Sequence, residues 1–365
     1  MNKSHELKNT IAKIGVALFD FFAGKKTYPL HKSAPRILII STTALGDTLW
    51  ATPILKAIKQ QHPKSFVGVL TSPMGKQVLA GNKHIDRLWV LRPLGILAYP
   101  IWRQCLKQRF EAVLIFHASQ RVAFLLARCI RASIIAGMAG KMKDLDWIAN
   151  IHYPFNKDHL HAVQCRFQLA KSIGIEPIKS PCELPISKQD QNRAAEYLKS
   201  LQLPQDTLLV GLHPGASKLD KQWPEEKFIA LGQWLCQNPK VHIIVTGGPG
   251  EEYLTSKIAK ALPRATALQG QLSIHALTAL LGKMSVFIAN DTGPIHLAAL
   301  NITPIVGIYG VSEHIEHSYP YRNHHVTLIE TPLSNATAKD PRGVKCISLM
   351  DVKKAVSLYI KGLPE

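Results

Sequence analysis

Short apolar runs rich in Val, Ile and Leu alternate along this chain with amphipathic segments of helical length. Most runs are continuously apolar, which is typical of parallel strands covered on both faces. Such alternation predicts βαβ units and an α/β fold. The expected strands are Arg36–Ile40, Phe66–Leu70, Leu88–Leu91, Ala112–Phe116 and Ser133–Gly137, then Leu208–Leu212, Val241–Thr246, Ser285–Ala289, Ile305–Tyr309 and Val326–Ile329. The expected helices include Thr48–Gln61, Ser119–Ile130, Glu225–Gln237, Glu251–Leu262 and Ile295–Leu300.

The two series of strands predict two doubly wound, Rossmann-like domains, which suits a length of 365 residues. Three prolines lie within Ile175–Pro185 and indicate the linker. Two such domains would place a ligand in a cleft between them, at the carboxyl ends of the strands. The expected divisions are an extension over 1–35, a first domain over 36–175, a linker region over 176–204, a second domain over 205–350, and a C-terminal helix over 351–365 that could pack back on the first domain.

The net charge of +19 is unevenly distributed. Residues 1–180 contain 26 Lys and Arg against 9 Asp and Glu, whereas residues 181–365 contain 18 against 16. A basic half suggests that one domain meets a polyanion: nucleic acid, an anionic membrane or a phosphorylated substrate. The six cysteines include no C-x-x-C pair, which argues against a disulfide scaffold or clustered zinc and favours a reducing cytosol. No apolar run approaches the roughly 20 residues that span a bilayer, so we expect a soluble protein.

The extension has its own pattern. Within Ile11–Phe22 the apolar residues recur at helical spacing, and lysines such as Lys8, Lys13 and Lys25 flank or interrupt them. One interpretation is a basic amphipathic helix lying on an anionic membrane. The alternatives are a helix that packs on the domain and a secretory signal, although Asp20 interrupts the apolar region.

Asp47 follows the first strand, beside the flexible Gly46. A carboxylate at this turn could accept a proton from a substrate hydroxyl. The alternative is that Asp47 caps a helix that begins at Thr48, because Asp favours that position.

The second half contains groups suited to a diphosphate. The loop after Leu208–Leu212 offers backbone amides, a hydroxyl and two lysines, the groups that a phosphate needs, although it could equally be a solvated basic loop. Asn290–Gly293 and Thr246–Glu251 are Gly-containing turns from a strand into a helix, where free amides can meet an anion. The candidate residues in this loop and these two turns are Ser217, Lys218, Lys221, Glu251, Asp291, Thr292 and Gly293.

A metal site is the weaker interpretation of another cluster. Glu313, His314, Glu316 and His317 offer the carboxylate and imidazole groups of zinc ligands, and His324 and His325 follow. The segment lies between Gly310 and Pro320 and is predicted to be loop, so we expect no metal.

In this order, these segments resemble glycosyltransferase family 9, the lipopolysaccharide heptosyltransferases of Gram-negative bacteria. The likeness runs from about Arg36 to Ile360. Three ordered blocks determine it, with two lesser matches. The blocks are Gly46-Asp47-(x)₄-Thr52-Pro53, then His213-Pro-Gly-Ala-Ser with Lys221-x-Trp223-Pro224, and then Asn290-Asp-Thr-Gly-Pro-Ile-His-Leu-Ala-Ala299; the lesser matches are His161-Ala-Val-x-x-Arg166 with Gly174, and Cys346-Ile-Ser with Val352.

The resemblance implies a GT-B fold and an inverting transfer of heptose from ADP-heptose. The acceptor would be the lipopolysaccharide inner core, either Kdo-lipid A or a heptosylated core, at the cytoplasmic face of the inner membrane. The basic first domain would receive this acceptor, and neither a metal nor a cofactor would be needed. The implied roles are Asp47 as general base; Ser217, Lys221, Thr292 and Gly293 at the diphosphate; Asp291 at the sugar hydroxyls; Glu251 at the ribose; His296 in support; and Arg121, a loose match, at acceptor phosphates.

Two departures and two alternatives remain. The extension over 1–35 is longer than usual for the family, and Ser312–His317 replaces a loop that usually reads more like Pro-Thr-Asp-Pro, which leaves the sugar open. A non-catalytic protein that binds a nucleotide or an anionic glycolipid could use the same fold, but would have no reason to keep Asp47. A nucleic-acid-binding protein would depend on the basic half alone, without an aromatic stacking platform or a known motif, so we expect no nucleic-acid partner.

Overall fold

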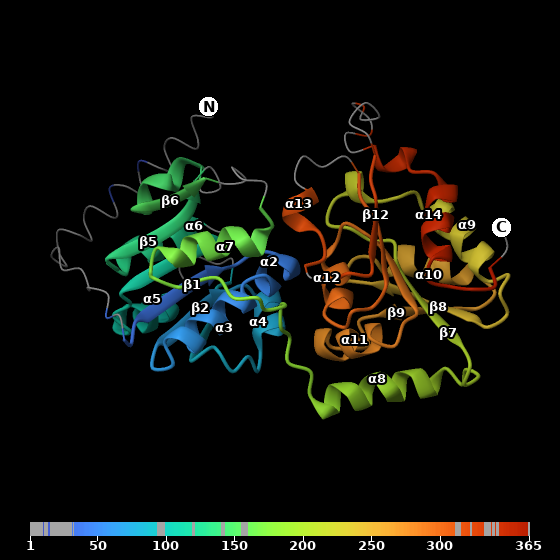
Figure 1. Ribbon diagram of the computed structural model, residues 1–365, viewed down its shortest axis with the longest axis horizontal. Helices are drawn as coiled ribbons and strands as arrows, with labels where there is room; N and C mark the ends of the chain where they lie inside the picture. The colour runs from blue at the N-terminus through green and yellow to red at the C-terminus, as the bar shows by residue number, and fades with distance from the viewer. Residues whose placement is uncertain are drawn as a thin grey trace. The chain divides into compact units, whose positions relative to one another are not determined.

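The computed structural model describes Thr10, Ile14, His31 and residues 33–92, 99–118, 121–139, 143–154, 160–310, 315–321, 323–331, 337, 340 and 343–363. The chain divides into two compact units, Met1–Leu184 and Pro185–Glu365 (Figure 1). This boundary lies inside the region 176–204 in which we expected the linker. The predicted amphipathic helix Ile11–Phe22 lies outside the described residues except for Ile14.

In the described part of the first unit, six parallel strands form one sheet in the order β3-β2-β1-β4-β5-β6. The strands are β1 (Arg36–Ser41), β2 (Phe66–Thr71), β3 (Arg87–Val90), β4 (Ala112–His117), β5 (Ile134–Ala139) and β6 (Ile151–Pro154). The helices are α2 (Leu45–Leu49), α3 (Thr52–Gln61), α4 (Pro73–Leu79), α5 (Tyr99–Lys107), α6 (Arg121–Cys129), the 3-10 helix η2 (Lys143–Ile148) and α7 (Ala162–Lys171).

The second unit repeats this plan. Its described residues form a parallel sheet of six strands in the order β12-β11-β10-β7-β8-β9. The strands are β7 (Leu208–His213), β8 (Val241–Gly247), β9 (Ala265–Gln269), β10 (Val286–Asn290), β11 (Ile305–Ile308) and β12 (Val326–Ile329). The helices are α8 (Lys188–Ser200), η3 (Leu219–Lys221), α9 (Glu225–Leu235), α10 (Glu252–Lys260), α11 (Ile274–Leu281), α12 (Gly293–Ala299), α13 (Ile315–Ser318), η5 (Val344–Cys346) and α14 (Leu349–Ser357).

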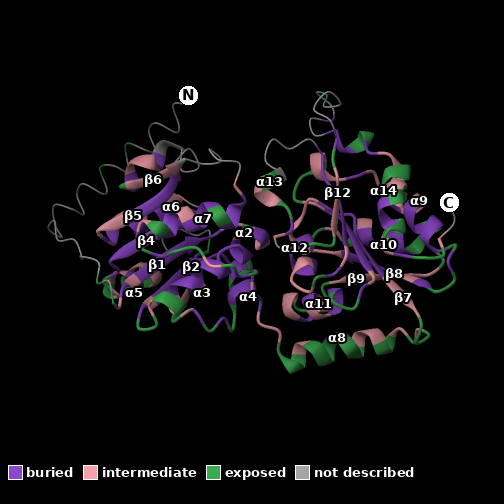
Figure 2. Cartoon of the chain, in the orientation of Figure 1, coloured by how far each residue is buried: buried purple, intermediate pink, exposed green. Residues whose placement is uncertain are grey.

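The central strands are buried, as their continuous apolar sequences predict. Figure 2 shows the strands largely in the buried colour, and Ile37–Ile40 of β1 are fully buried. Each buried Leu or Ile side chain contributes roughly 1.5–3 kcal/mol relative to an exposed one. In the topology that results, the carboxyl ends of β1 and β4 are neighbours in the first sheet, and those of β7 and β10 are neighbours in the second. Within each sheet, the residues that follow one of these strands can therefore contact the residues that follow its neighbour.

The C-terminal helix contributes to the core of the second unit. The sequence left open that residues 351–365 pack back on the first domain. In the structure, α14 follows a Ser348 cap, and its buried residues Val352 and Val356 belong to the hydrophobic core of the second unit, with Trp223 and Phe228. The apolar face of α14 is thus buried within the second unit, to which the helix itself belongs.

One other local feature differs from the prediction. The expected helix Thr48–Gln61 is two helices, α2 and α3, with a break at Trp50 and Ala51. Pro53 lies near the start of α3, where its missing N–H leaves no helical hydrogen bond unmade. None of the helices in the described ranges is long and apolar enough to cross a membrane.

Candidate active site

Asp47 lies in the first turn of α2, just beyond the carboxyl end of β1. The residue at the N-cap of α2 is Ala44, and the helix begins at Leu45. The alternative that Asp47 caps a helix beginning at Thr48 is therefore wrong. Its side chain is instead available for contacts with neighbouring elements.

Three donors surround the Asp47 carboxylate. Arg166 Nη2 lies 3.1 Å from Oδ1, while Oδ2 accepts from Thr43 Oγ1 at 3.1 Å and lies 3.2 Å from His117 Nδ1. Arg166 comes from α7 and His117 from the end of β4, so the cluster joins three elements far apart in sequence. Both carboxylate oxygens are thereby held in fixed directions.

Arg166 is a buried cation, with a side chain only 2% exposed. Helix α7 positions it: His161 caps this helix, and Arg166 Nη1 donates to the Ala162 carbonyl at 2.9 Å. Its guanidinium lies 5.5 Å from the centre of the Trp50 ring, within the range of a cation–π contact. Burial lowers the pKa of Arg166, and the charge of Asp47 opposes this effect. The buried charge therefore depends on the Asp47 carboxylate.

The same contacts affect the Asp47 carboxyl group. Burial by itself raises the pKa of Asp47, but the hydrogen bond and charge of His117, the charge of Arg166 and the Thr43 hydroxyl together outweigh it. The pKa of Asp47 is held well below its ordinary value. Asp47 is thus an anion at every pH at which the protein is expected to work.

In the second unit, Asn290 ties the end of β10 to the loop after β7. This fully buried side chain accepts from the Trp223 amide at 3.1 Å and donates to the Pro214 carbonyl at 2.7 Å. Trp223 Nε1 in turn donates to the Ile347 carbonyl at 3.0 Å. The loop that contains Ser217 and Lys221 is therefore held at both ends.

Lys221 and Asp291, two of the predicted site residues, contact each other. The Lys221 ammonium forms an ion pair with Asp291 Oδ2, and both side chains are about one-fifth exposed. Lys221 belongs to η3, and Asp291 follows β10 directly. The pair places one cation and one carboxylate at the same edge of the second sheet.

Glu251 is anchored close to the β7 loop. Its Oε2 accepts from the Gly248 amide at 2.7 Å and lies 3.6 Å from His213 Nε2. A Cβ atom on Gly215 would lie 1.9 Å from Glu251 Oε1, so this close approach requires glycine. Burial lowers the pKa of His213 although the charge of Glu251 opposes the change, so His213 is uncharged near neutral pH.

The remaining predicted residues have simpler positions. Thr292 precedes α12 with extended backbone, and Gly293 is the first residue of that helix. His296 is buried on α12, whereas Ser217 is exposed. Arg121, proposed for the acceptor, is the first residue of α6 and is half-buried. Asp291, Thr292 and Gly293 thus follow β10 consecutively.

Three residues of these clusters were not predicted from the sequence. The motifs gave His117 no role and Arg166 only a place in a lesser match, although both contact Asp47. Tyr309, which directly follows β11 and is fully buried, was predicted only as the last residue of a strand. Burial, with the nearby charge of Asp291, raises the pKa of Tyr309 well above its ordinary value. The available signal for His117 was a polar residue directly after a predicted strand, and for Tyr309 a residue with a hydroxyl at the end of one.

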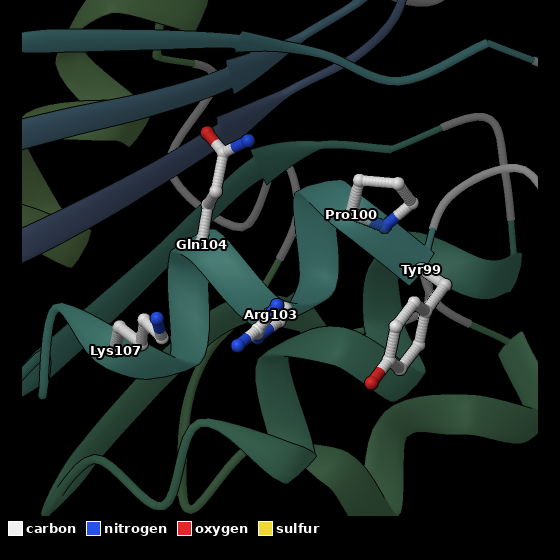
Figure 3. Close-up of a pocket in the computed structure, with 5 residues that line it drawn as sticks. All are labelled: Tyr99, Pro100, Arg103, Gln104 and Lys107. Atoms are coloured by element: carbon white, nitrogen blue, oxygen red, sulfur yellow. The ribbon is translucent and has the colours of Figure 1, made fainter.

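A separate cavity lies on α5 of the first unit. It has a volume of about 240 Å³, and all five lining residues belong to that helix (Figure 3). Tyr99, Arg103 and Lys107 recur every four residues, so they share one face of α5. The Tyr99 side chain is 71% exposed, and Gln104 accepts a hydrogen bond from Trp89 Nε1 of β3. The cavity is thus a basic, aromatic surface feature rather than part of the Asp47 cluster.

The histidine-rich segment gives no metal site in the described residues. Glu313 and His314 lie outside them, and elsewhere in the described ranges no group of three His, Cys, Asp or Glu side chains is placed to hold a metal ion.

Comparisons with known proteins identify the family. The model for glycosyltransferase family 9 (heptosyltransferase) matches residues 99–343. Lipopolysaccharide core heptosyltransferase OpsX of Haemophilus influenzae is 25% identical over 312 residues, which cover 81% of this chain and 84% of the relative. Lipopolysaccharide heptosyltransferase 3 of Escherichia coli is 22% identical over 74% of this chain and 81% of its own length.

Solved structures show the same fold. A family 9 glycosyl transferase from Veillonella parvula has a TM-score of 0.77 at 22% identity, covering 90% of this chain and 98% of the other. ADP-heptose lps heptosyltransferase II of Escherichia coli has a TM-score of 0.71 at 17% identity, covering 89% and 98%. The predicted GT-B architecture of two Rossmann-like domains is confirmed.

Proposed function

The chain belongs to glycosyltransferase family 9 and is a glycosyltransferase, and we propose that it moves heptose from ADP-heptose onto the lipopolysaccharide inner core. The acceptor would be Kdo-lipid A or a core that already contains heptose. Relatives named as lipopolysaccharide heptosyltransferases support this substrate class. The observation on which the proposal mainly depends is the pre-formed pair of Lys221 and Asp291 at the end of β10.

The proposed reaction is a single displacement with inversion. The acceptor hydroxyl loses its proton to a base in the Asp47 cluster, and Asp47 is the base that the family resemblance implies. The acceptor oxygen then bonds to C1 of the sugar while the bond from C1 to the diphosphate oxygen breaks. Lys221 neutralises the charge that develops on the leaving diphosphate, so the proposal requires neither a metal nor a cofactor.

The donor would bind in the second unit. Lys221, Ser217 and the backbone at Thr292 and Gly293 are proposed to contact the diphosphate. Asp291 would hold the sugar hydroxyls, which would lie beside the diphosphate because Asp291 contacts Lys221. Glu251 would contact the ribose, and His296 would support the start of α12 from within the core.

The acceptor would meet the first unit at the cytoplasmic face of the inner membrane. Residues 87–109 include five Lys or Arg residues and no Asp or Glu. Within this segment, the exposed face of α5 combines Tyr99 with Arg103 and Lys107, side chains suited to the interface of an anionic bilayer. Arg121 is proposed to contact acceptor phosphates. Together they support a peripheral membrane location.

Nucleotide binding tests the donor assignment. A ligand that binds only the folded protein raises its melting temperature. We expect stabilisation by ADP and ADP-heptose and much weaker stabilisation by GDP and UDP. Preference for GDP or UDP would show that this family member uses another nucleotide sugar.

A further inference from the structure

We propose that His117 is the catalytic group that takes the proton from the acceptor hydroxyl, and that Asp47 orients it. This inference rests on the proposed transfer reaction and moves the proton-accepting atom from the Asp47 carboxylate to His117 Nε2. Neither the motifs nor the resemblance gave His117 a role.

The backbone fixes His117 beside Asp47. Strands β1 and β4 are parallel neighbours, and a register shift after Ile40 pairs Ser41 with His117. The Thr42 amide donates to the His117 carbonyl at 2.9 Å, which holds the end of β4 against the turn into α2. The His117 side chain remains 33% exposed, so a substrate can reach the ring.

The contact with Asp47 determines which ring nitrogen is free. A carboxylate only accepts hydrogen bonds, so His117 Nδ1, 3.2 Å from Asp47 Oδ2, must bear the proton. In the neutral ring the lone pair is then on Nε2. In a Ser-His-Asp triad an aspartate in contact with Nδ1 has this role: the carboxylate fixes the tautomer and stabilises the imidazolium.

Asp47 itself is poorly suited to receive the proton. Its Oδ1 accepts from Arg166 and its Oδ2 from Thr43 and His117. Protonating the carboxylate would leave the buried Arg166 guanidinium without its counter-ion, a change that typically costs several kcal/mol. A neutral imidazole, by contrast, can accept a proton at Nε2 while the Asp47–Arg166 ion pair stays intact.

Two charged groups face the ring. Asp47 of α2 lies 3.2 Å from Nδ1, and Arg166 of α7 contacts the other oxygen of the same carboxylate. Because Asp47 stays ionised, one negative charge always lies next to the ring. The added proton therefore forms a charge-assisted pair rather than an isolated cation.

The reaction balances with these groups. The acceptor O–H bond breaks and its proton bonds to His117 Nε2, while the oxygen electrons form the bond to C1 of the sugar. The C1–O bond breaks, and its electron pair leaves with the diphosphate. The imidazolium then loses its proton to solvent, which restores the starting state.

The first test is His117→Asn, because the Asn amide can still donate to Asp47 near the position of Nδ1 but offers no basic nitrogen. We expect ADP affinity and melting temperature close to those of the wild type. We expect kcat to fall by about 10²–10⁴, the range for lost acid–base catalysis, and the acidic limb of the kcat/KM profile to disappear. The matched control is His152→Asn, an exposed histidine on β6, which should leave both kcat and the profile unchanged.

Chemical rescue separates a base from a positioning residue. In His117→Ala, added imidazole should restore part of the lost kcat, since the free base can enter the space left by the ring. A kcat for His117→Asn within threefold of wild type, a retained acidic limb, or absence of rescue would overturn the role of His117. If the wild type and His117→Asn both transfer sugar at the normal rate, the role of His117 is wrong but the proposed function still holds. A wild type that transfers no sugar would overturn both.

Discussion

At the scale of single residues, the central feature is a buried cation whose counter-ion is the predicted catalytic carboxylate. Arg166 is nearly inaccessible, and Asp47 is the acid that contacts it. The Asp47 side chain is thus both half of a buried ion pair and the carboxylate of the proposed catalytic cluster. Substituting Asp47 therefore changes stability as well as chemistry, and the two effects need separate measurement.

We predict that Asp47→Asn lowers turnover by about 10² or more without changing ADP affinity. It should also lower the free energy of unfolding near neutral pH, because Arg166 loses its counter-ion. The folded pKa of Asp47 is depressed, so its contribution to stability is full above the ordinary carboxyl value of about 3.9 and is lost as the pH falls below it. Denaturant unfolding should show a constant difference between the two proteins from about pH 7 to about pH 5, and a difference that shrinks below about pH 4.

The control for this prediction is Asp206→Asn, because the Asp206–Lys240 pair is mostly exposed and such pairs contribute little. A stability difference for Asp47→Asn that stays constant with pH would contradict the role of the buried pair. Near-normal turnover would remove Asp47 from catalysis.

Lys221 gives the second residue-scale prediction. A charge-assisted contact with a diphosphate contributes on the order of 1.5–3 kcal/mol, so Lys221→Ala should weaken ADP binding by about 10- to 100-fold and lower turnover. Isothermal titration calorimetry measures the affinity directly. Lys218→Ala, an exposed lysine of the same loop, is the matched control and should change affinity little. Equal effects of the two substitutions would mean that Lys221 provides only general positive charge.

The sequence motifs predicted Asp47, Lys221 and Asp291 because each follows a strand that can be read from its apolar run. They did not predict their partners. Arg166 is 119 residues from Asp47, and no local pattern shows that α7 brings it to α2. His117 ends an apolar run and was included in no motif, so its contact with Asp47 became visible only with the pairing of β1 and β4.

At the scale of elements, apolar runs located the central strands well but missed the weaker edges. All ten predicted strands correspond to observed ones. The strand β6 is only four residues long, and β9, Ala265–Gln269, is only half-buried and has few β-branched residues. Both are edge strands, so neither needs a continuously apolar sequence. The ends of helices depended on caps and on tertiary contacts that periodicity does not include.

The turn between β7 and η3 gives an element-scale prediction. A Cβ on Gly215 would overlap Glu251, so Gly215→Ala must displace that carboxylate from its place beside the loop. If Glu251 contacts the ribose, ADP should bind about 3- to 10-fold more weakly, the scale of one lost hydrogen bond. In Gly248→Ala the new Cβ would make only an ordinary 3.4 Å contact, and affinity should be retained. Unchanged affinity in Gly215→Ala would exclude Glu251 from the donor site.

Membrane attachment is tested on two elements. Each Lys or Arg near an anionic surface contributes about 1 kcal/mol, and salt weakens the attraction. Reversing the charges of Arg103 and Lys107 on α5 should therefore reduce flotation with anionic liposomes at low salt.

Deleting residues 1–32 tests the extension, and should lower turnover on acceptor in vesicles but not on delipidated acceptor. Equal flotation of all variants and the full-length protein would contradict both roles.

At the scale of the whole molecule, the two units have similar sheets but different charge. The excess of basic residues lies in residues 1–180, while residues 181–365 are nearly neutral. This division agrees with a polyanionic acceptor at the first unit and a nucleotide sugar at the second. Substitutions at Asp47 or His117 should therefore affect turnover, and those at Lys221 or Gly215 should also affect nucleotide affinity.

The most direct measurement is sugar transfer by the purified full-length protein, with ADP-heptose as donor and Kdo-lipid A or a heptosylated core as acceptor. Mass spectrometry of the acceptor and release of ADP report the reaction together. We predict that the acceptor gains one heptose for each ADP released, and that Asp47→Asn releases about a hundredfold less in the same time. Failure to transfer heptose to either acceptor, or equal product from wild type and Asp47→Asn, would contradict the proposed function.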